Sequence, residues 1–144
     1  WFDLHAELEG PKEVSLGICL TGHLRGLCKP EDGVDQLYEF ILSRFPSFDV
    51  FVAVPHKDCE RAHQLFDGTK IHPIIECIDA HAIPAEEEKW LGEGPMTDPD
   101  VCDARYCGYV WRDVSKCASI MQRHIEKHRV SYWRVARARI DLQW

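Results

Sequence analysis

The sequence predicts an α/β fold of three layers with a mostly parallel, Rossmann-like sheet. Two observations predict it. Short apolar runs of strand length alternate along the chain with longer segments whose apolar residues recur at helical spacing. In addition, a strand, a helix and a strand in that order imply a right-handed parallel crossover, which places helices over the faces of the sheet.

The first half of the chain supplies one such crossover. Residues 14–21 place large apolar residues at every second position with small ones between, as in a strand buried on both faces. The acids of Pro30-Glu31-Asp32 favour a helix start, and Phe45-Pro46 ends the helix because a residue before proline avoids helical backbone angles. Residues 48–54 are β-branched and aromatic, which predicts a second buried strand.

The second half continues the alternation after a shorter helix. Cys59, Ala62, Leu65 and Phe66 lie at helical spacing, and Asp67-Gly68 is a plausible end for that helix. Residues 71–78 predict a third strand, with Pro73 near its start or on an edge. Residues 106–128 then carry the longest helical pattern, with the stripe Val110, Val114, Cys117, Met121 and Ile125.

Composition is that of one ordinary globular domain. With 144 residues, 45% of them hydrophobic, the chain is long enough to bury a core. We expect residues 1–13 to be a lead-in and residues 14–144 to form a single α/β domain, with an irregular insertion at about 79–105. Since the chain begins at Trp1 without methionine and stops just after a charged strand, we also expect it to be a fragment of a longer protein.

Charge and hydropathy exclude two classes of partner. The formal net charge is −7, which argues against a general nucleic-acid binder that depends on phosphate neutralisation. Basic residues gather late in the chain, which suits an anionic small molecule better than a polymer. No run approaches the roughly 18 apolar residues of a membrane helix, so we expect no membrane span in this piece.

The last strand carries the clearest candidate site. Alternation sends Arg137, Arg139 and Asp141 to one side of residues 131–144 and apolar residues to the other. Arginine forks match phosphate geometry, and the acid suits a metal ion or a sugar hydroxyl. An edge strand with cross-paired surface charges is the plainer interpretation of the same pattern.

A glycine-flanked turn follows the first strand and supplies the other half of this candidate site. Open α/β sheets bind ligands at the carboxyl ends of their strands, which is where Thr21, Gly22 and Arg25 stand. Glycine lets the backbone approach a ligand, and Arg25 is long enough to reach a phosphate. The turn is neither a Gly-x-Gly-x-x-Gly fingerprint nor a Walker loop, so a plain strand-to-helix turn stays open as the alternative.

The seven cysteines show no framework of disulfides or metal ligands. Cys19 and Cys77 lie in apolar runs and are most simply small buried hydrophobes, whereas Cys102 and Cys107 flank a loop and could pair in an oxidising compartment. His124 and His128, one helical turn apart, with Cys117 form a weaker metal hypothesis.

Four segments taken together resemble a plant and algal family described as glycosyltransferase-like. They are Gly17-Ile-Cys-Leu-Thr-Gly-His-Leu-Arg25, Phe45-Pro-Ser-Phe-Asp-Val-Phe-Val52, the helix 106–122 with its Cys117, and Tyr132-Trp-Arg-Val-Ala-Arg-Ala-Arg-Ile-Asp141. The resemblance spans nearly the whole chain through short, degenerate motifs: Leu-x-Gly-x-x-Arg, Tyr-Pro-x-x-Asp-x-Phe and Arg-x-Arg-x-Asp. It implies a nucleotide-sugar-binding half of the GT-A type.

The resemblance also implies roles for the candidate residues. Thr21, Gly22 and Arg25 would face the nucleotide of a nucleotide sugar, Arg137 and Arg139 its diphosphate, and Asp141 a divalent cation, manganese or magnesium. The usual Asp-x-Asp pair is replaced here by Asp141 followed by leucine and glutamine, which puts metal dependence in question. The acceptor is unknown. The resemblance together with an N-terminal anchor would place the protein in the Golgi or secretory lumen; otherwise it would be cytoplasmic.

The alternative function is a non-catalytic α/β binding module that uses the same basic edge of the sheet.

Overall fold

The computed structural model describes residues 10–22, 24, 30–79 and 104–140 of the chain. Strands and helices alternate along them. The elements are β1 (Lys12–Thr21), α1 (Pro30–Phe40), the 3-10 turn η1 (Leu42–Arg44), β2 (Phe48–Pro55), the 3-10 turn η2 (His56–Asp58), α2 (Cys59–Phe66), β3 (Ile74–Ile78), α4 (Ala104–His128) and β4 (Val130–Arg139).

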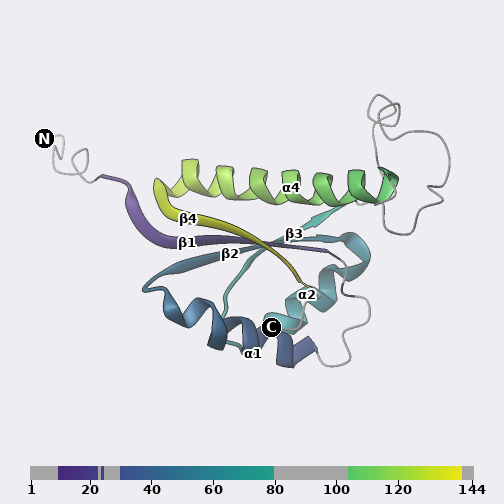
Figure 1. The fold of residues 1–144 in the computed structure, drawn as a ribbon, viewed down its shortest axis with the longest axis horizontal. Coiled ribbons are helices and arrows are strands. Elements are labelled where there is room, and N and C mark those ends of the chain that lie inside the picture. The colour runs from purple at the N-terminus through teal and green to yellow at the C-terminus, as the bar shows by residue number, and fades with distance from the viewer. Residues whose placement is uncertain (1–9, 23, 25–29, 80–103, 141–144) are drawn as a thin grey trace, which may run out of the picture.

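The strands form one sheet in the order β3-β2-β1-β4, and every described pair is parallel. Helix α4 covers one face, and α1 and α2 cover the other (Figure 1). The predicted α/β fold with three layers and a parallel sheet is therefore confirmed. All four strands end at the same edge of the sheet, which we call the carboxyl edge.

The boundaries differ from the predicted ones in small ways with local causes. Strand β3 begins at Ile74 and not at Ile71, because Pro73 has no N–H to donate to a strand ladder. Ile71 nevertheless lies in the core, 1% exposed, from a position before the strand. Strand β1 begins at Lys12, inside the expected lead-in, and α4 begins at Ala104. Most of the predicted irregular insertion, residues 80–103, lies outside the described residues.

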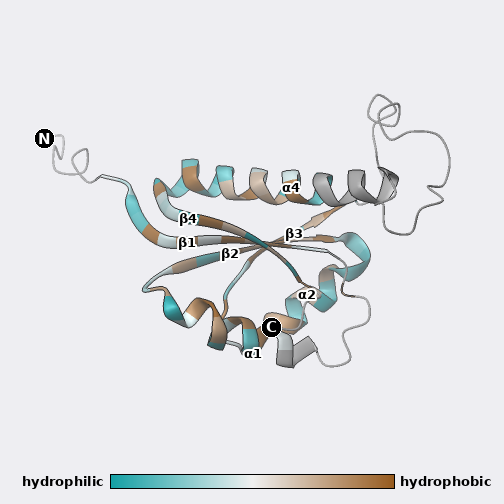
Figure 2. Ribbon diagram, viewed as in Figure 1, coloured by the Kyte–Doolittle hydropathy of each residue, from teal (hydrophilic) through white to brown (hydrophobic). Residues whose placement is uncertain are grey.

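Each face of the sheet has its own apolar cluster. Leu16, Ile18 and Leu20 of β1 pack with apolar residues of α1 and α2, and the alternate residue Cys19 packs with Phe51 under α4. Figure 2 shows apolar stretches along the strands, and hydrophilic residues alternating with apolar ones along the helices on either side of the sheet. The central strands are thus buried on both sides, as the unbroken apolar runs of their sequences indicate.

Two glycines allow the turns that shape the chain around this core. Gly22, directly after β1, adopts a φ of 127°, and Gly68, after α2, a φ of 72°. Residues with a Cβ rarely take such angles, so glycine is required where the chain leaves each element. Among the helices described, none combines the length and apolarity needed to cross a membrane.

Candidate functional site

The carboxyl ends of β1 and β4 lie side by side and bring the two halves of the candidate site together. The strand register pairs Thr21 with Arg139 and Cys19 with Arg137. Beyond the ladder, the backbone N–H of Ile140 donates a hydrogen bond to the carbonyl oxygen of Thr21 at 2.9 Å. Residues 118 positions apart in sequence therefore meet at one point of the carboxyl edge, where open α/β sheets bind ligands.

The predicted alternation along β4 is present. Ala136 and Ala138 pack against the core cluster on the α1 face, and Ile140 belongs to that cluster. Arg137 and Arg139 are exposed. Both arginines are therefore accessible, about 7 Å apart along the strand, which is the spacing of alternate residues.

Thr21 and Gly22 offer a ligand mainly their backbone. Thr21 is only 2% exposed, so its hydroxyl is buried at the end of β1. Gly22 is half-buried in its left-handed conformation. A ligand at this edge would consequently meet the main chain of the turn and the arginines of β4.

Leu24, which comes shortly after β1, contacts the turn that follows β2. The backbone N–H of Leu24 donates to Oδ2 of Asp58 at 3.4 Å, and the Leu24 side chain is fully buried. Asp58 ends η2, which follows β2 directly. Leu24 is thus joined to the turn that follows β2.

Two predicted site residues, Arg25 and Asp141, lie outside the described residues. Arg139, Leu20 and Ile140 border a cavity of about 10 Å³ with residues of α1 and with Phe66 of α2. A cavity of that volume has room for about one water molecule.

A larger cavity lies elsewhere, between α1 and the segment that joins α2 to β3. Its volume is about 460 Å³, within the range of small-molecule sites. Asp35, Glu39, Thr69 and Lys70 are among the residues that line it, and the Lys70 Nζ lies 5.0 Å from the centre of the Tyr38 ring. The carboxylates oppose an anionic ligand there, so this cavity does not serve the chemistry predicted for the carboxyl edge.

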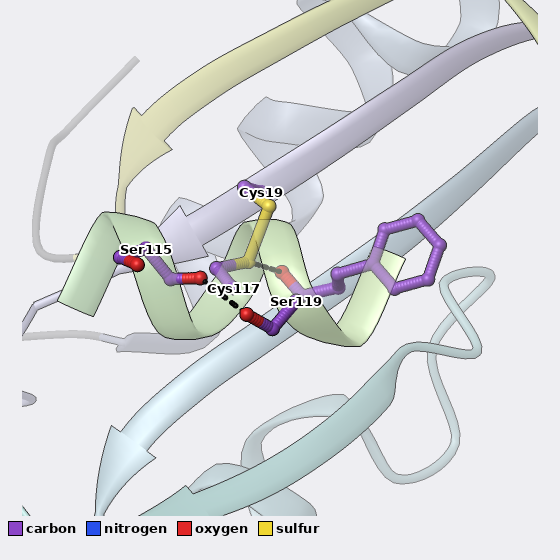
Figure 3. The surroundings of a disulfide bond; sticks show 5 residues. Cys19, Ser115, Cys117 and Ser119 are labelled. Atoms are coloured by element: carbon purple, nitrogen blue, oxygen red, sulfur yellow. Dashed lines mark hydrogen bonds between the residues drawn. A yellow bond between two sulfur atoms is a disulfide. The ribbon is translucent and has the colours of Figure 1, made fainter. Parts of the chain in front are cut away.

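Two cysteine pairs were not predicted. Cys19 of β1 and Cys117 of α4 form a disulfide with their Cα atoms 5.9 Å apart, which Figure 3 shows between strand and helix. Cys59 and Cys77 form a second, with Cα atoms 5.6 Å apart. The interpretation of Cys19 and Cys77 as simple buried hydrophobes was therefore wrong, because both form disulfides. The predicted burial of Cys19 is correct, since that residue is 6% exposed.

The hypothesis that Cys117, His124 and His128 bind a metal also fails. Cys117 is fully buried and bonded to Cys19, with its Sγ 3.6 Å from the carbonyl oxygen of Phe51. The two histidine rings contact each other, with centroids 4.5 Å apart. The apolar stripe of residues 106–128 already placed Cys117 among the packing residues of that helix, and the structure confirms this position.

A cluster of three polar side chains, which the sequence did not predict, joins α4 to β2 and β4. The hydroxyl of Tyr132 donates to Oδ2 of Asp49 at 2.7 Å, and Nε2 of His124 lies 3.6 Å from the same oxygen. Burial, followed by the hydrogen bond to Asp49, raises the pKa of Tyr132. Burial lowers the pKa of His124 by more than the charge of Asp49 raises it. Asp49 lies near the start of β2, so this cluster is remote from the carboxyl edge and serves packing.

No family model, curated protein or solved structure matches the chain.

Proposed function

We propose that the chain is a glycosyltransferase-like domain that binds the diphosphate of a nucleotide sugar at the carboxyl edge of its sheet. The observation that carries the proposal is the pairing of Thr21 with Arg139 at the ends of two neighbouring parallel strands. The pairing supports the proposal because it joins the turn expected to meet the nucleotide to the strand expected to meet its phosphates.

The chemistry of the edge suits this ligand. Sugar transfer from a diphosphate requires that negative charge on the leaving group be stabilised, by arginines or by a divalent cation. Arg137 and Arg139 are two exposed arginine residues on one strand. Manganese or magnesium held by Asp141 would be the second means, since carboxylate oxygen is the ligand that these hard cations prefer.

A non-catalytic binding module is the second candidate, and one observation favours it. The cavity that Arg139 borders is about 10 Å³, whereas sites that enclose a small molecule measure roughly 300–1,000 Å³. An anionic group held on an open basic edge needs no deep pocket. In this alternative the same arginines bind a phosphate or carboxylate without transferring a sugar.

The disulfides support the secretory lumen as the compartment. Disulfides persist in oxidising compartments and are rare in the reducing cytosol. The Cys19–Cys117 pair is buried between β1 and α4, as expected of a structural bridge. We therefore favour the Golgi or secretory lumen over the cytoplasm for this domain.

Thermal unfolding with nucleotide diphosphates and sugar nucleotides tests the function. Uridine or guanosine diphosphate, with manganese or magnesium, is expected to raise the melting temperature; a ligand at about 100 times its Kd stabilises by about 2.7 kcal/mol, which amounts to several degrees. Arg139→Ala and Asp141→Asn are expected to abolish the shift. Arg134→Ala is the matched control, because Arg134 is also an exposed arginine of β4 but lies farther from the carboxyl edge.

Three outcomes separate the candidates. A shift that is larger for sugar nucleotides than for pyrophosphate, with slow release of the sugar, supports the transferase. An equal shift with pyrophosphate and no turnover supports the binding module. If no nucleotide diphosphate or sugar nucleotide changes the melting temperature, the transferase proposal is wrong.

A further inference from the structure

Three side chains with metal-binding atoms gather at the β3 end of the carboxyl edge, away from the arginines. The sulfur atoms of Cys59 and Cys77 and an imidazole nitrogen of His63 all lie within 4.8 Å of one another. Cys59 and His63 stand four residues apart on α2 and so share one face of that helix. Cys77 reaches the same point from β3, where its register partner is Val54 near the end of β2.

Solvent exposure distinguishes the Cys59–His63–Cys77 group from the other cysteine pair. Cys59 and Cys77 are half-buried, and His63 is exposed. Cys19 and Cys117 are 6% and 0% exposed beneath α4. Because thiol–disulfide exchange requires that a thiolate reach a sulfur atom, the Cys59–Cys77 bond is the one that a dissolved thiol can open.

We propose that Cys59, His63 and Cys77 bind one zinc ion when the two cysteines are reduced. The two thiols each lose a proton to become thiolates, and the neutral imidazole supplies the third ligand. A tetrahedral zinc ion then keeps one position for water or for an exogenous ligand. Thiolate and imidazole ligands select zinc over magnesium or manganese, so this ion would differ from the cation expected at Asp141.

The distances are compatible with such a site after small side-chain rotations. Zinc–sulfur and zinc–nitrogen bonds of about 2.3 Å and 2.1 Å place tetrahedral ligand atoms about 3.6–3.8 Å apart. The three ligand atoms here lie within 4.8 Å of one another, so the imidazole nitrogen of His63 must move toward the sulfur atoms by about 1 Å at most. Its position on the exposed side of α2 leaves room for that movement, while the two sulfur atoms separate when their bond opens.

The same two sulfur atoms cannot hold zinc and a disulfide at once, which makes the site sensitive to redox state. When an external disulfide oxidises the zinc-bound pair, the two thiolates give up two electrons and form the Cys59–Cys77 bond. The S–S bond of the external disulfide accepts those electrons and breaks, and with two protons from solvent it becomes two thiols. Zinc is released in that step. The site lies three strand spacings of about 4.8 Å from β4, so it is independent of the diphosphate site proposed above.

Cobalt binding to the reduced protein tests the proposal, since cobalt(II) takes zinc's place and gives visible spectra. The protein would carry Cys28→Ser, Cys102→Ser and Cys107→Ser, so that the remaining thiols come from the two bonded pairs. After treatment with a phosphine reductant, we expect one equivalent of cobalt to produce a thiolate charge-transfer band and the ligand-field bands of a tetrahedral ion. One equivalent of zinc should then abolish them.

Variants assign the ligands. Cys77→Ser is expected to lose the thiolate band, and His63→Ala to weaken cobalt binding at least about tenfold, since loss of even an outer-shell partner of a metal ligand costs about 10–100-fold. His56→Ala is the matched control: it is an exposed histidine of the neighbouring η2 turn, outside the cluster, and should bind like the parent. Oxidised glutathione should release one equivalent of metal.

The proposal is overturned by any of three results: no thiolate band in the reduced protein, equal affinity in His63→Ala and His56→Ala, or equal binding before and after oxidation. Circular dichroism checks that each variant is folded. Should Cys77→Ser unfold, the histidine pair still decides the matter, because both histidines are exposed. A failure to bind zinc would not change the melting-temperature shift expected with nucleotides, so each proposal can be wrong without the other.

Discussion

Gly17 shows how one absent side chain governs the packing of three elements. A Cβ built on Gly17 would lie 3.1 Å from the ring of Tyr132 and 3.2 Å from Cε of Met121. Met121 is flexible at that end and can move away. The ring of Tyr132 is held by its hydrogen bond to Asp49, so it resists displacement. The sequence shows a small residue within an apolar strand but not what occupies the space beside it.

We therefore predict that Gly17→Ala destabilises the protein by about 1 kcal/mol, at the low end of overpacking costs because only one of the two neighbours is fixed. Urea denaturation measures the change. Gly10→Ala is the control, since a Cβ there meets nothing within 4 Å. Equal stability of the two variants would show that the Tyr132 ring adjusts freely.

At the scale of elements, a small polar cluster helps α4 to hold its place on the sheet. His124 of α4 packs its ring edge-on against Phe51 of β2, with centroids 5.4 Å apart, and Phe51 contacts Tyr132 of β4 in the same way. Asp49 joins this group through Tyr132. The side chain of His124 is 19% exposed, so charging it would place a cation in a largely buried position.

His124 should therefore make folding stability depend on pH. Burial, opposed by Asp49 and assisted by His128, Lys12 and Lys127, lowers the pKa of His124 below 6.5 in the folded protein. Well above pH 6.5 the imidazole is neutral in both states and has no effect. As pH falls below 6.5, the unfolded chain takes up a proton that the folded protein resists, so stability falls, by no more than about 1.4 kcal/mol per pH unit.

Urea denaturation between pH 7.5 and pH 5 measures this slope. We expect His124→Gln to be less pH-dependent than the parent across that range. His72→Gln, at an exposed position before β3, should keep the parent slope. A His124→Gln slope identical to the parent's would assign the pH dependence to other groups.

At the scale of the whole molecule, the disulfide between Cys19 and Cys117 joins the first strand to the last helix. It spans 98 residues of sequence, whereas the Cys59–Cys77 bridge spans 18. In the chain-entropy description, a bridge stabilises by restricting the unfolded chain, and longer loops gain more. The difference between loops of these lengths amounts to about 1.5 kcal/mol.

Removal of the long bridge should accordingly cost more than removal of the short one. We predict that Cys19→Ala with Cys117→Ala lowers the free energy of unfolding by about 4 kcal/mol or more, because it also empties space in the core. Cys59→Ser with Cys77→Ser should cost about 3 kcal/mol or less. Denaturation without reductant measures both losses. A larger loss from removal of the Cys59–Cys77 pair would contradict the ranking.

The candidate site was foreseen in part, and its limits have a physical cause. The alternation that exposes Arg137 and Arg139 is a local property of strand geometry, and so is the need for glycine at position 22. That Thr21 meets Arg139 depends on β4 lying beside β1, which no local pattern specifies. Cys59 and Cys77 had a usable signal. Cys59 begins the helix after β2, Cys77 is the residue before the last of β3, and the ends of parallel strands lie at one edge.

The sequence by itself determined the elements, their order and the α/β class, because these follow from apolar periodicities of two and 3.6 residues that neighbouring residues carry. Only the tertiary structure decided the strand order, the cysteine pairs and the Asp49–Tyr132–His124 cluster. Each of these joins residues far apart in the chain, from 18 positions for Cys59 and Cys77 to 118 for the neighbours Thr21 and Arg139 of β1 and β4. Such contacts form only when loop closure is offset by burial across the whole core.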